Sequence, residues 1–300
     1  MAAPRLVVIG SSNTDMIVNV PRLPAGGETV LGDEVVMVPG GKGANQAVAA
    51  ARLGAQVHLV TRVGDDLFGE QSLANFRAAG LDTSFVTRDT DAASGVALIF
   101  VDGCGENAIA VASGANASLS PTEVDRAREA IAVAHAVVLQ LEIPLASVLH
   151  AAAVAKSLGT RVILNPAPAA PLPAELLRNV DVLIPNEHEA TQLVGAGTPA
   201  AQAQRLLECG VGAVVITLGA GGVYYRSAEG GGTIAAHPVD VVDTTAAGDC
   251  FTGALAVALG EGQPLAGAGA CANAAAALAV TRRGAQPSLP VRAEVDRLLH

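Results

Sequence analysis

Residues 243–249, Asp-Thr-Thr-Ala-Ala-Gly-Asp, place a carboxylate in the first turn of an expected helix, directly after a turn of small residues. Small residues let backbone N–H groups approach an anion closely, and the N-terminus of a helix favours negative charge. Asp249 could therefore take a proton from a nucleophile beside a bound phosphate. It could also simply cap the helix, which is the commoner role of Asp at such positions. These residues alone leave both roles open.

A second glycine-rich segment, Gly40-Gly-Lys-Gly-Ala-Asn-Gln46, also follows a β-rich run and opens a helix. Glycine permits close backbone approach to a ligand, and Asn45 offers both a donor and an acceptor. The segment is not a P-loop, because Gly43 follows the Gly-Lys pair and Val36 stands where that motif begins with Gly. Lys42 is one of only two lysines in the chain. It is a candidate ligand group, although a solvated turn lysine fits the sequence equally well.

Two further segments carry weaker signals. In Asn186-Glu-His-Glu189, Glu189 could bind a hydrated Mg²⁺ near phosphates, because Mg²⁺ keeps several waters and uses few protein carboxylates. Asn and Glu at the start of a helix are also ordinary capping residues. Thr217-Leu-Gly-Ala-Gly-Gly222 could cradle a nucleotide or make a tight hairpin into residues 223–225. A nicotinamide-dependent dehydrogenase is disfavoured, since no G-x-G-x-x-G pattern follows the first expected strand.

The elements that must position these residues alternate along the chain. Strand-like runs that end in Gly, Asn or Asp are expected at 6–9, 57–63, 137–141, 161–165, 182–184 and 213–218, and helices at 44–53, 69–79, 122–134, 145–158, 199–209, 247–259 and 265–281. Nearly continuous apolar strands separated by helices predict an α/β fold with a parallel sheet covered on both faces. Ligands of such sheets bind at the carboxyl ends of the strands. Candidate polar residues fall there: Asn13, Asp15, Glu142, Asn165 and the segment 186–189.

Two regions interrupt this alternation. Residues 16–38 contain short β-like runs at 17–20, 29–31 and 34–38, and residues 94–111 contain runs at 96–101 and 108–111. We expect antiparallel β-structure here, forming one small sheet beside the ligand crevice. That sheet could be a lid that excludes water or an ordinary edge sheet. We expect residues 1–300 to form a single α/β domain with this sheet, at about 16–38 and 94–111, inserted in it. Gly230-Gly-Gly232 is expected to be a hairpin turn.

Composition excludes several classes of protein. A net charge of −10 argues against nucleic acid as a partner. No apolar run is long enough to cross a membrane, and the N-terminus lacks a signal-peptide layout, which predicts a cytoplasmic protein. The four cysteines show no metal-type spacing, and we expect them to be reduced thiols in or near the core: Cys104, Cys209, Cys250 and Cys271.

Segments 40–46, 186–189 and 243–249 occur in the order found in the ribokinase/PfkB family of carbohydrate kinases, which the chain resembles from residue 10 to residue 290. Weaker segments at 10–15, 140–142, 165–168 and 279–288 favour ribose as the sugar. The resemblance implies a three-layer α/β/α sandwich with a mainly parallel sheet and a β-sheet lid. It implies ATP-dependent phosphorylation of D-ribose to D-ribose 5-phosphate.

The resemblance also implies a role for each matching position. Asp249 would be the general base, and the backbone N–H groups of Ala246, Ala247 and Gly248 would form the anion hole. The wider family more often has Gly at position 246, a change we expect to matter little because a backbone N–H is what is used. Sugar contacts would come from Asn13, Asp15, Gly41, Lys42, Asn45, Glu142 and Asp249. ATP contacts would come from Asn186, Thr217, Gly219, Gly222, Gly248 and Asn273, with Glu189 acting on Mg²⁺ and the phosphates. The family commonly has His where Asn273 stands.

A K⁺ site and a homodimer are implied in the same way. Hard oxygen ligands suit such a cation, and the matching positions are Asp243, Thr245, Ala279, Arg282, Gly284 and Ser288. Loop 282–288 could equally serve only to close the fold. The homodimer would pair the lid sheets of two chains. Two alternatives stay open: a kinase of this family for fructose, 2-keto-3-deoxygluconate or a nucleoside such as adenosine, and a sugar-binding regulator without phosphoryl transfer.

Overall fold

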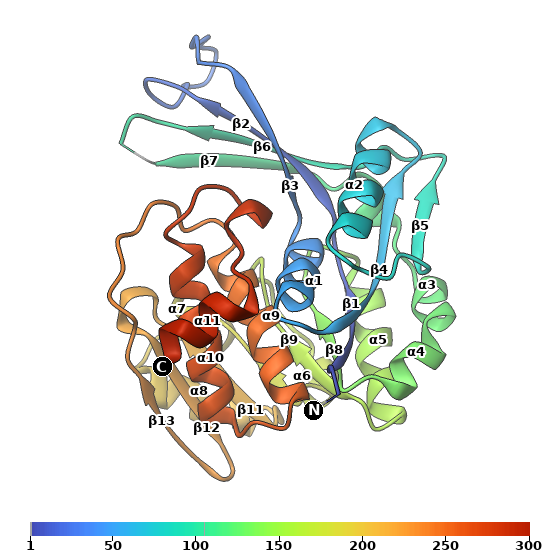
Figure 1. Ribbon diagram of the computed structural model, residues 1–300, viewed down its shortest axis with the longest axis vertical. Helices are drawn as coiled ribbons and strands as arrows, with labels where there is room; N and C mark the ends of the chain where they lie inside the picture. The colour runs from blue at the N-terminus through green and yellow to red at the C-terminus, as the bar shows by residue number, and fades with distance from the viewer. Residues whose placement is uncertain (1, 105) are drawn as a thin grey trace.

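The computed structural model describes residues 2–104 and 106–300. A nine-stranded sheet lies at the centre of the molecule (Figure 1). The strand order is β13-β12-β11-β10-β9-β8-β1-β4-β5, and the seven strands from β11 to β5 run parallel. Their bounds are β1 Arg5–Ile9, β4 Gln56–Gly64, β5 Val86–Asp89, β8 Ala136–Leu139, β9 Arg161–Leu164, β10 Val182–Leu183, β11 Ala213–Thr217, β12 Val223–Ser227 and β13 Gly230–Ile234.

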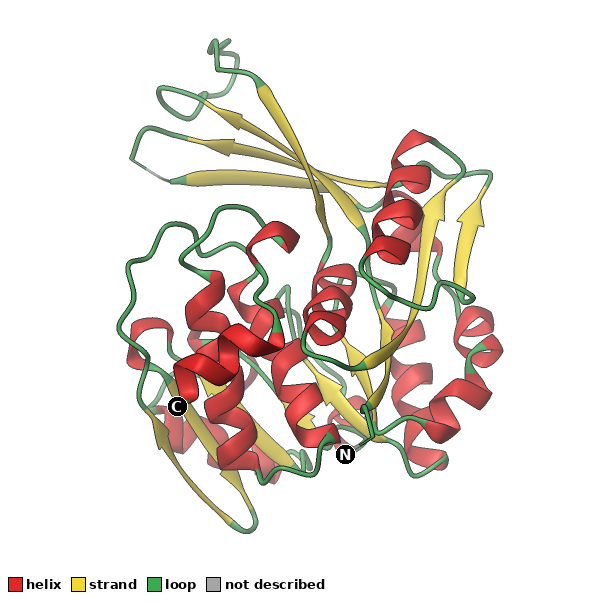
Figure 2. Cartoon of the chain, in the orientation of Figure 1, coloured by secondary structure: helices red, strands yellow, loops and turns green. Residues whose placement is uncertain are grey.

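Helices cover both faces of this sheet, so the predicted three-layer α/β/α sandwich is confirmed (Figure 2). Alternate residues of β1 enter two separate cores, Leu6 and Val8 on one face and Val7 and Ile9 on the other. The first face packs against α1 Lys42–Arg52, α2 Leu67–Ala78, α9 Ala247–Gly260, α10 Leu265–Ala279 and α11 Arg292–Leu299. The second packs against α3 Pro121–Arg126, α4 Arg128–Val133, α5 Leu145–Ser157, α6 Ala174–Arg178, α7 Glu187–Val194 and α8 Pro199–Glu208.

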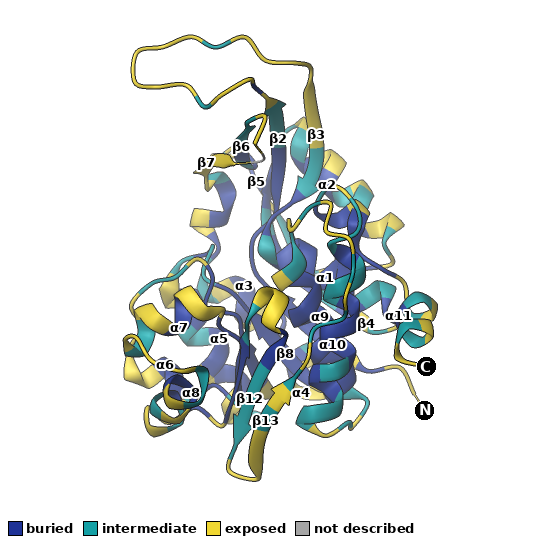
Figure 3. Ribbon diagram, turned by 90° about the vertical axis from the view of Figure 1, so that its left-hand side faces the viewer, coloured by how far each residue is buried: buried dark blue, intermediate teal, exposed yellow. Residues whose placement is uncertain are grey.

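The two inserted regions meet in one four-stranded sheet that projects from the body (Figure 3). Its order is β3-β2-β6-β7, with β2 Asn13–Asn19, β3 Val35–Gly40, β6 Gly95–Val101 and β7 Asn107–Ala112. The antiparallel structure expected within each region is confirmed, because β2 pairs with β3 and β6 with β7 in this way. The two regions join through β2 and β6, which are parallel. Both strands leave the body at neighbouring points, with Asn13 opposite Gly95, and therefore run outward together. The predicted run at 29–31 is also wrong, since residues 20–34 form a loop.

Three local predictions need correction. The helix expected at 122–134 is interrupted at Ala127, where φ −89° and ψ 4° end α3 before α4 begins. The turn expected at Gly230–Gly232 lies instead at Ala228-Glu229, and the glycines belong to β13. A Cβ at Gly231 would lie 2.7 Å from the carbonyl oxygen of Tyr225, so this strand needs glycine there. Cys250 and Cys271 are buried as expected, but Cys104 and Cys209 are exposed.

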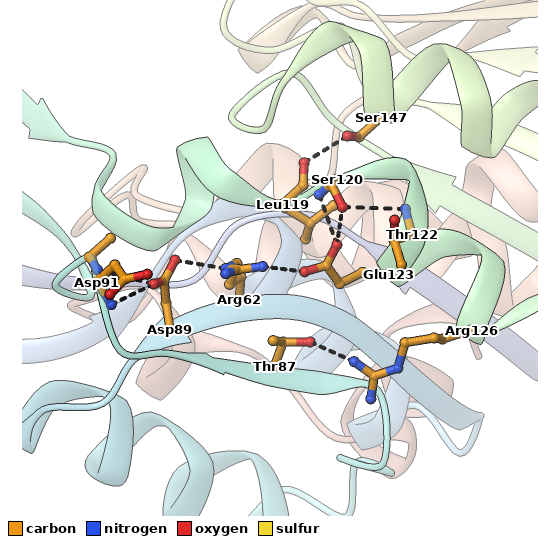
Figure 4. A network of polar contacts seen from close by, with 11 residues as sticks. Arg62, Thr87, Asp89, Asp91, Leu119, Ser120, Thr122, Glu123, Arg126 and Ser147 are labelled. Atoms are coloured by element: carbon orange, nitrogen blue, oxygen red, sulfur yellow. Dashed lines mark hydrogen bonds and ion pairs between the residues drawn. The ribbon is translucent and has the colours of Figure 1, made fainter.

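Arg62 of β4 ties the edge of the large sheet to the helical layer (Figure 4). Its Nε donates to Asp89 Oδ2 of β5 at 2.7 Å, and its Nη1 pairs with Glu123 of α3. The guanidinium holds the pKa of Asp89 below its ordinary value. Glu123 also closes a capping box with Ser120, so one ion network fixes two strands and a helix start. No helix in the described ranges is long and apolar enough to cross a bilayer.

Helices α1 and α9 approach each other unusually closely at Gly253. A Cβ at this position would lie 2.7 Å from the carbonyl oxygen of Gln46 and 2.8 Å from the Cβ of Ala49. Both distances are well inside van der Waals contact, so only glycine fits. This contact lies one turn beyond Asp249 in α9 and brings its first turn beside Asn45 and Gln46 of α1.

We expect Gly253→Val to lower the free energy of unfolding by about 1–3 kcal/mol or more, because the side chain would force the two helices apart. Urea denaturation followed by circular dichroism measures this change. Gly267→Val in α10 is the matched control, because the Cβ there would meet its nearest neighbour at an ordinary 3.4 Å. Equal stability losses in the two variants would contradict the argument from close packing.

Candidate active site

Asp249 lies in the first turn of α9 with only 6% of its surface exposed. Both of its oxygens accept hydrogen bonds from amides of α1. Asn45 Nδ2 donates to Oδ2 and Gln46 Nε2 donates to Oδ1, each at 3.0 Å. A buried carboxylate requires such donors, because leaving its charge unpaired would be costly. The structure therefore brings the two predicted motifs, 40–46 and 243–249, into direct contact.

The turn before α9 contains the one non-glycine residue with positive φ in the described ranges, Ala246 at φ 59° and ψ 12°. In the same ranges, the N–H groups of Ala246 and Gly248 donate to no protein acceptor. Ala247 N–H donates to Thr244 O at a long 3.2 Å. The turn thus offers outward N–H groups at a helix N-terminus, which is the usual arrangement of an anion site. The left-handed conformation at Ala246 carries a strain that the sequence did not predict.

Two cavities adjoin at this helix start. The larger, of about 490 Å³, lies between the turn after β11 and helices α9 and α10, and its lining includes the predicted ATP contacts Thr217, Gly219, Gly222, Gly248 and Asn273. The smaller, of about 210 Å³, is lined by Lys42, Asn165, Asn186, Glu189 and Asp249 among others. The cavities share Thr217, Thr244, Ala247 and Gly248. An elongated ligand lying in both would cross the N-terminus of α9.

Asn273 of α10 is largely buried, and its Nδ2 donates to Ala235 O at 2.7 Å. Its amide therefore holds the segment after β13 against the wall of the larger cavity. Gly222, with φ 85°, closes the turn after β11, and a Cβ there would lie 2.1 Å from Ile234 O. These contacts fix the shape of the cavity that the predicted ATP residues line.

Glu189 is a capping residue, as one of the two sequence interpretations held. Its carboxylate accepts from Asn186 N at 2.8 Å and from Asn186 Nδ2 at 3.0 Å, and Asn186 Oδ1 accepts from Glu189 N at 2.8 Å. Burial raises the pKa of Glu189, because the charged form loses solvation. The same carboxylate lines the smaller cavity with Asp249, so the cap and the candidate ligand are one group.

The predicted sugar residues lie at the start of β2, at the start of α1 and after β8. Glu142 Oε2 accepts from Ser11 Oγ at 2.6 Å and from Lys42 N at 3.0 Å, which joins the strand ends of the body to the start of α1. Asn13 Oδ1 accepts from Asn116 Nδ2 at 2.8 Å, and Asn116 also bonds both the N–H and the carbonyl of Ser12. Sequence reasoning missed Asn116, a lone buried Asn in the short 3-10 helix Gly114–Ser118, because no motif surrounds it. A cavity of about 350 Å³ is lined by Asn13, Asn116 and Glu142 together with apolar residues.

Charges are concentrated in this region. Burial raises the pKa of Asp15 to about 7, and the negative charges of Glu142 and Asp249 add to the effect while Lys42 opposes it. The charge of Asp249 in turn raises the pKa of Lys42, against the cost of burial. Lys42 is half-buried at the start of α1, so it is not the freely solvated turn lysine that the sequence left open.

The predicted cation residues lie around the loop between α10 and α11. Asp243 Oδ1 accepts from Thr245 N at 2.9 Å and Oδ2 accepts from Gly284 N at 2.8 Å. Ala279 O accepts from Arg282 N, and Ser288 is fully buried, with its Oγ donating to Ala285 O at 2.8 Å. The guanidinium of Arg282 pairs with Glu294 of α11, so only its backbone is available to this loop. Within the described residues, no three His, Cys, Asp or Glu side chains gather as a metal site.

An α/β sandwich whose cavities meet at a helix start with unpaired N–H groups is typical of an enzyme that binds a phosphorylated small molecule. The chain belongs to the pfkB family of carbohydrate kinases, which it matches over residues 3–292. It is 43% identical to the ribokinase of Bacillus subtilis over 98% of this chain and 99% of that one. It is 37% identical to the deoxyribokinase of Salmonella typhi over 95% of each chain. The structure of Arabidopsis thaliana ribokinase complexed with ribose and ATP superposes with a TM-score of 0.93, at 35% identity and over 100% and 99% of the two chains.

We expect Asp15→Asn to stabilise the free protein on the order of 1–4 kcal/mol at pH 8, and much less at pH 4. The pKa of Asp15 is raised from 3.8 to about 7, so between these values the folded chain holds a proton that the unfolded chain has released. The free energy of unfolding therefore falls as the pH rises from about 4 to about 7. The neutral amide of the Asp15→Asn variant cannot ionise, so the variant does not lose this stability. Denaturant titrations at several pH values measure the difference.

Asp82→Asn is a control in which the expected change in stability has the opposite sign, because the pKa of Asp82 is lowered whereas that of Asp15 is raised. The hydroxyl of Ser84 holds the pKa of Asp82 below its ordinary value, so ionisation of Asp82 stabilises the folded chain. Its amide variant should lose stability, more at pH 8 than at pH 4. A stability gain of Asp15→Asn that does not change with pH would contradict the assigned pKa.

Proposed function

We propose that this protein transfers the γ-phosphoryl group of ATP to D-ribose and yields D-ribose 5-phosphate. The observation that carries the proposal is the buried Asp249, set at a helix N-terminus between a nucleotide-sized cavity and a group of sugar-type ligands. The ribokinase relatives, at about 40% identity over nearly the whole chain, support ribose as the acceptor. The ribose and ATP bound to the Arabidopsis enzyme support this pair of substrates.

In this mechanism Asp249 is the general base. Its carboxylate takes the proton of the sugar 5-hydroxyl, whose oxygen attacks the γ-phosphorus as the bond to the β-phosphate oxygen breaks and ADP leaves. The N–H groups of Ala246, Ala247 and Gly248 stabilise the negative charge on the transferring group. In other anion holes, removal of one such fixed donor costs roughly 3–4 kcal/mol of transition-state stabilisation. The N-terminal dipole of α9 acts in the same direction.

Substrate binding follows from the donors and acceptors around the cavities. Carboxylates and amides pair well with the neighbouring hydroxyls of a sugar, and they are supplied by Asn13, Asp15, Lys42, Asn45 and Glu142, with the backbone of Gly41. ATP would lie along the larger cavity against Thr217, Gly219, Gly222 and Asn273, with Asn186 and Gly248 nearer the phosphates.

The residues also fit the two cations that this chemistry calls for. Glu189 lines the same cavity as Asp249, and each of its oxygens accepts one bond and keeps a free lone pair. Glu189 would therefore hold Mg²⁺ through water beside the ATP phosphates, where Mg²⁺ neutralises phosphate charge. The carbonyl-rich loop from Ala279 to Ser288, held by Asp243 and flanked by Thr245, Arg282 and Gly284, would hold K⁺ through hard oxygen ligands.

The small sheet would act as a lid and as the contact between two chains. Its strands carry apolar side chains that are unusually exposed, Val35, Val36, Met37, Leu98, Ile109 and Val111. Each is between 43% and 57% exposed, and the strand register places Val35, Met37 and Leu98 on one face of the sheet and Val36, Ile109 and Val111 on the other. Exposed apolar side chains on a sheet are typical of a surface that is covered in the working protein. Homodimer formation through the lids would cover it.

The direct test is ADP release with ATP, Mg²⁺ and K⁺ across ribose, deoxyribose, fructose, 2-keto-3-deoxygluconate and adenosine. We expect kcat/KM for ribose to exceed the others by at least about 10-fold, because a site built to bond specific hydroxyls rejects sugars that lack them. Deoxyribose is the sharpest comparison, given the deoxyribokinase relative. Asp249→Asn should keep ribose binding by calorimetry and lower kcat by about 10²–10⁴-fold.

Preference for another sugar would replace ribose while keeping the role of Asp249. Binding of ribose without ADP release by the folded parent protein would favour the sugar-binding regulator instead. An Asp249→Asn variant with parental kcat would exclude Asp249 as the base.

We expect kcat to fall when K⁺ is replaced by Na⁺ at constant ionic strength, because the smaller ion fits a K⁺-sized ring of carbonyls poorly. Asp243→Asn should abolish the difference between the two salts, since one Asp243 oxygen holds Gly284 N and the other Thr245 N. Initial rates over a range of K⁺ concentrations provide the measurement. Equal rates in K⁺ and Na⁺ for the parent protein would count against a cation site in this loop.

A further inference from the structure

Gln46 contacts the candidate base but lines none of the three cavities. It is fully buried in α1, and its Nε2 donates to Asp249 Oδ1 at 3.0 Å and to Asn165 Oδ1 at 3.2 Å. Its Oε1 accepts from Gln140 Nε2 at 2.6 Å. All three hydrogen bonds of this amide therefore go to side chains at the centre of the site, and none goes to the surface.

The orientation of the Gln46 amide is determined by its partners. Turning the amide over would set its oxygen against the Asp249 carboxylate and against Asn165 Oδ1, both of which are acceptors. Asn165 cannot turn either, because its own Nδ2 donates to Ile184 O at 2.9 Å. The amides of Gln140 and Asn165 thus fix the Gln46 amide so that its Nε2, and not its oxygen, faces Asp249 Oδ1.

Close packing holds this amide in place. The Gln46 backbone carbonyl faces Gly253, where no Cβ fits between α1 and α9. Behind it, Gln140 is pressed against Gly10, where a Cβ would lie 1.9 Å from Gln140 Oε1. A side chain at either glycine would displace the amide chain. Gly10 and Gly253 are therefore both needed to keep the Gln46 amide where it can donate to Asp249 Oδ1.

We propose that Gln46 is the positioning residue of the catalytic base: it anchors Asp249 Oδ1 and leaves Oδ2 to receive the sugar proton. Oδ2 is the oxygen bonded to Asn45, which belongs to the predicted sugar contacts, so it lies on the substrate side. The anchor restricts rotation of the carboxylate about its side-chain bonds, which keeps the base in line with the acceptor hydroxyl. The inference rests on the proposed function, since it assigns Asp249 the role of base.

The amide also stabilises the ionised base in a negatively charged setting. Charged or titratable groups that act on this region come from several elements: Asp15 on β2, Lys42 on α1, Glu142 after β8, Glu189 on α7 and Cys250 on α9. Of these, only Lys42 is cationic. Loss of a neutral donor to Asp249 Oδ1 would therefore make protonation of the base easier.

The test compares Gln46→Met and Gln46→Glu with the parent protein and with Gln202→Met. Gln202 in α8 is a matched control, because it is equally buried and its Nε2 also makes two hydrogen bonds, to Thr191 Oγ1 at 3.0 Å and Gly195 O at 3.2 Å. The measurements are kcat, KM for the acceptor sugar, KM for ATP and thermal midpoint, each from pH 5.5 to 9. The sugar is whichever acceptor the parent protein phosphorylates best.

We expect Gln46→Met to lower kcat by about 10–100-fold and to leave both KM values within about threefold, because the amide acts only through the base. The acid limb of the kcat profile should move to higher pH. Gln46→Glu should move it further, since two carboxyl groups would then compete for one proton. Gln202→Met should lower the thermal midpoint and leave kcat, both KM values and the acid limb unchanged.

A Gln46→Met variant with parental kcat and an unmoved acid limb overturns the inference. So does a loss of kcat that Gln202→Met reproduces in proportion to its lower thermal midpoint. Should Gln46→Met fail to fold, Gln46→Glu decides, because it keeps the length of the side chain and its acceptor for Gln140. A parent protein that phosphorylates no sugar refutes the proposed function instead, which separates the two failures.

Discussion

The rest of the site depends on the close contact of α1 with α9. Gly253 lets the two helices meet with no side chain between them, and this contact sets Asp249 against Asn45 and Gln46. A carboxylate buried to this degree would be unstable without donors, and the amides supply two. They come from a helix that begins with the glycine-rich segment, so the segment that supplies predicted sugar ligands also holds the base. A single packing contact therefore fixes the relation between the acceptor sugar and the residue that deprotonates it.

This arrangement concentrates negative charge where a polyanionic nucleotide must bind. Asp15, Glu142, Glu189 and Asp249 surround a single cation, Lys42, and burial already raises the pKa of Asp15 and Glu189. Such a surface suits a neutral sugar, whose hydroxyls donate to carboxylates, but it repels phosphate. The compensation must come from groups without a side-chain charge: the N–H groups of residues 246–248, of which those of Ala246 and Gly248 are unpaired in the described residues, and the dipole of α9, together with bound cations. Ala246 has a left-handed conformation, with φ 59°, which is strained for alanine. This conformation turns the backbone at the start of α9, where the N–H groups of Ala246 and Gly248 are left without protein acceptors in the described residues.

Sequence patterns predicted what depends on neighbours along the chain. The β-rich runs and their polar ends located β1, β8 and β9, and the small-residue turn located Asp249 at a helix start. Contacts between distant segments were beyond such patterns. Gln46 and Gln140 contribute to the site only because α1 meets the carboxyl ends of the strands, and Asn116 contributes only because its 3-10 helix lies beside the start of β2. The parallel pairing of β2 with β6 was missed for the same reason, since it follows from where both strands leave the body. Glu189 shows the reverse case, because the sequence offered cap and ligand as alternatives and the structure places one carboxylate where both uses are possible.

The division of the sugar residues between two parts of the molecule links binding to the lid. Asn13 and Asp15 belong to β2, a strand of the lid sheet, whereas Lys42, Asn45 and Glu142 belong to the body. Asn116 accepts a hydrogen bond from Ser12 N and donates one to Ser12 O. These two bonds fix β2 where it leaves the body. Any rotation of the lid about this point must carry Asp15 with it. A sugar that contacts the β2 residues and the body residues together therefore links the lid to the body. Its binding free energy would stabilise the position of the lid over the site. Exclusion of water from the reacting groups and recognition of the sugar are then the same event.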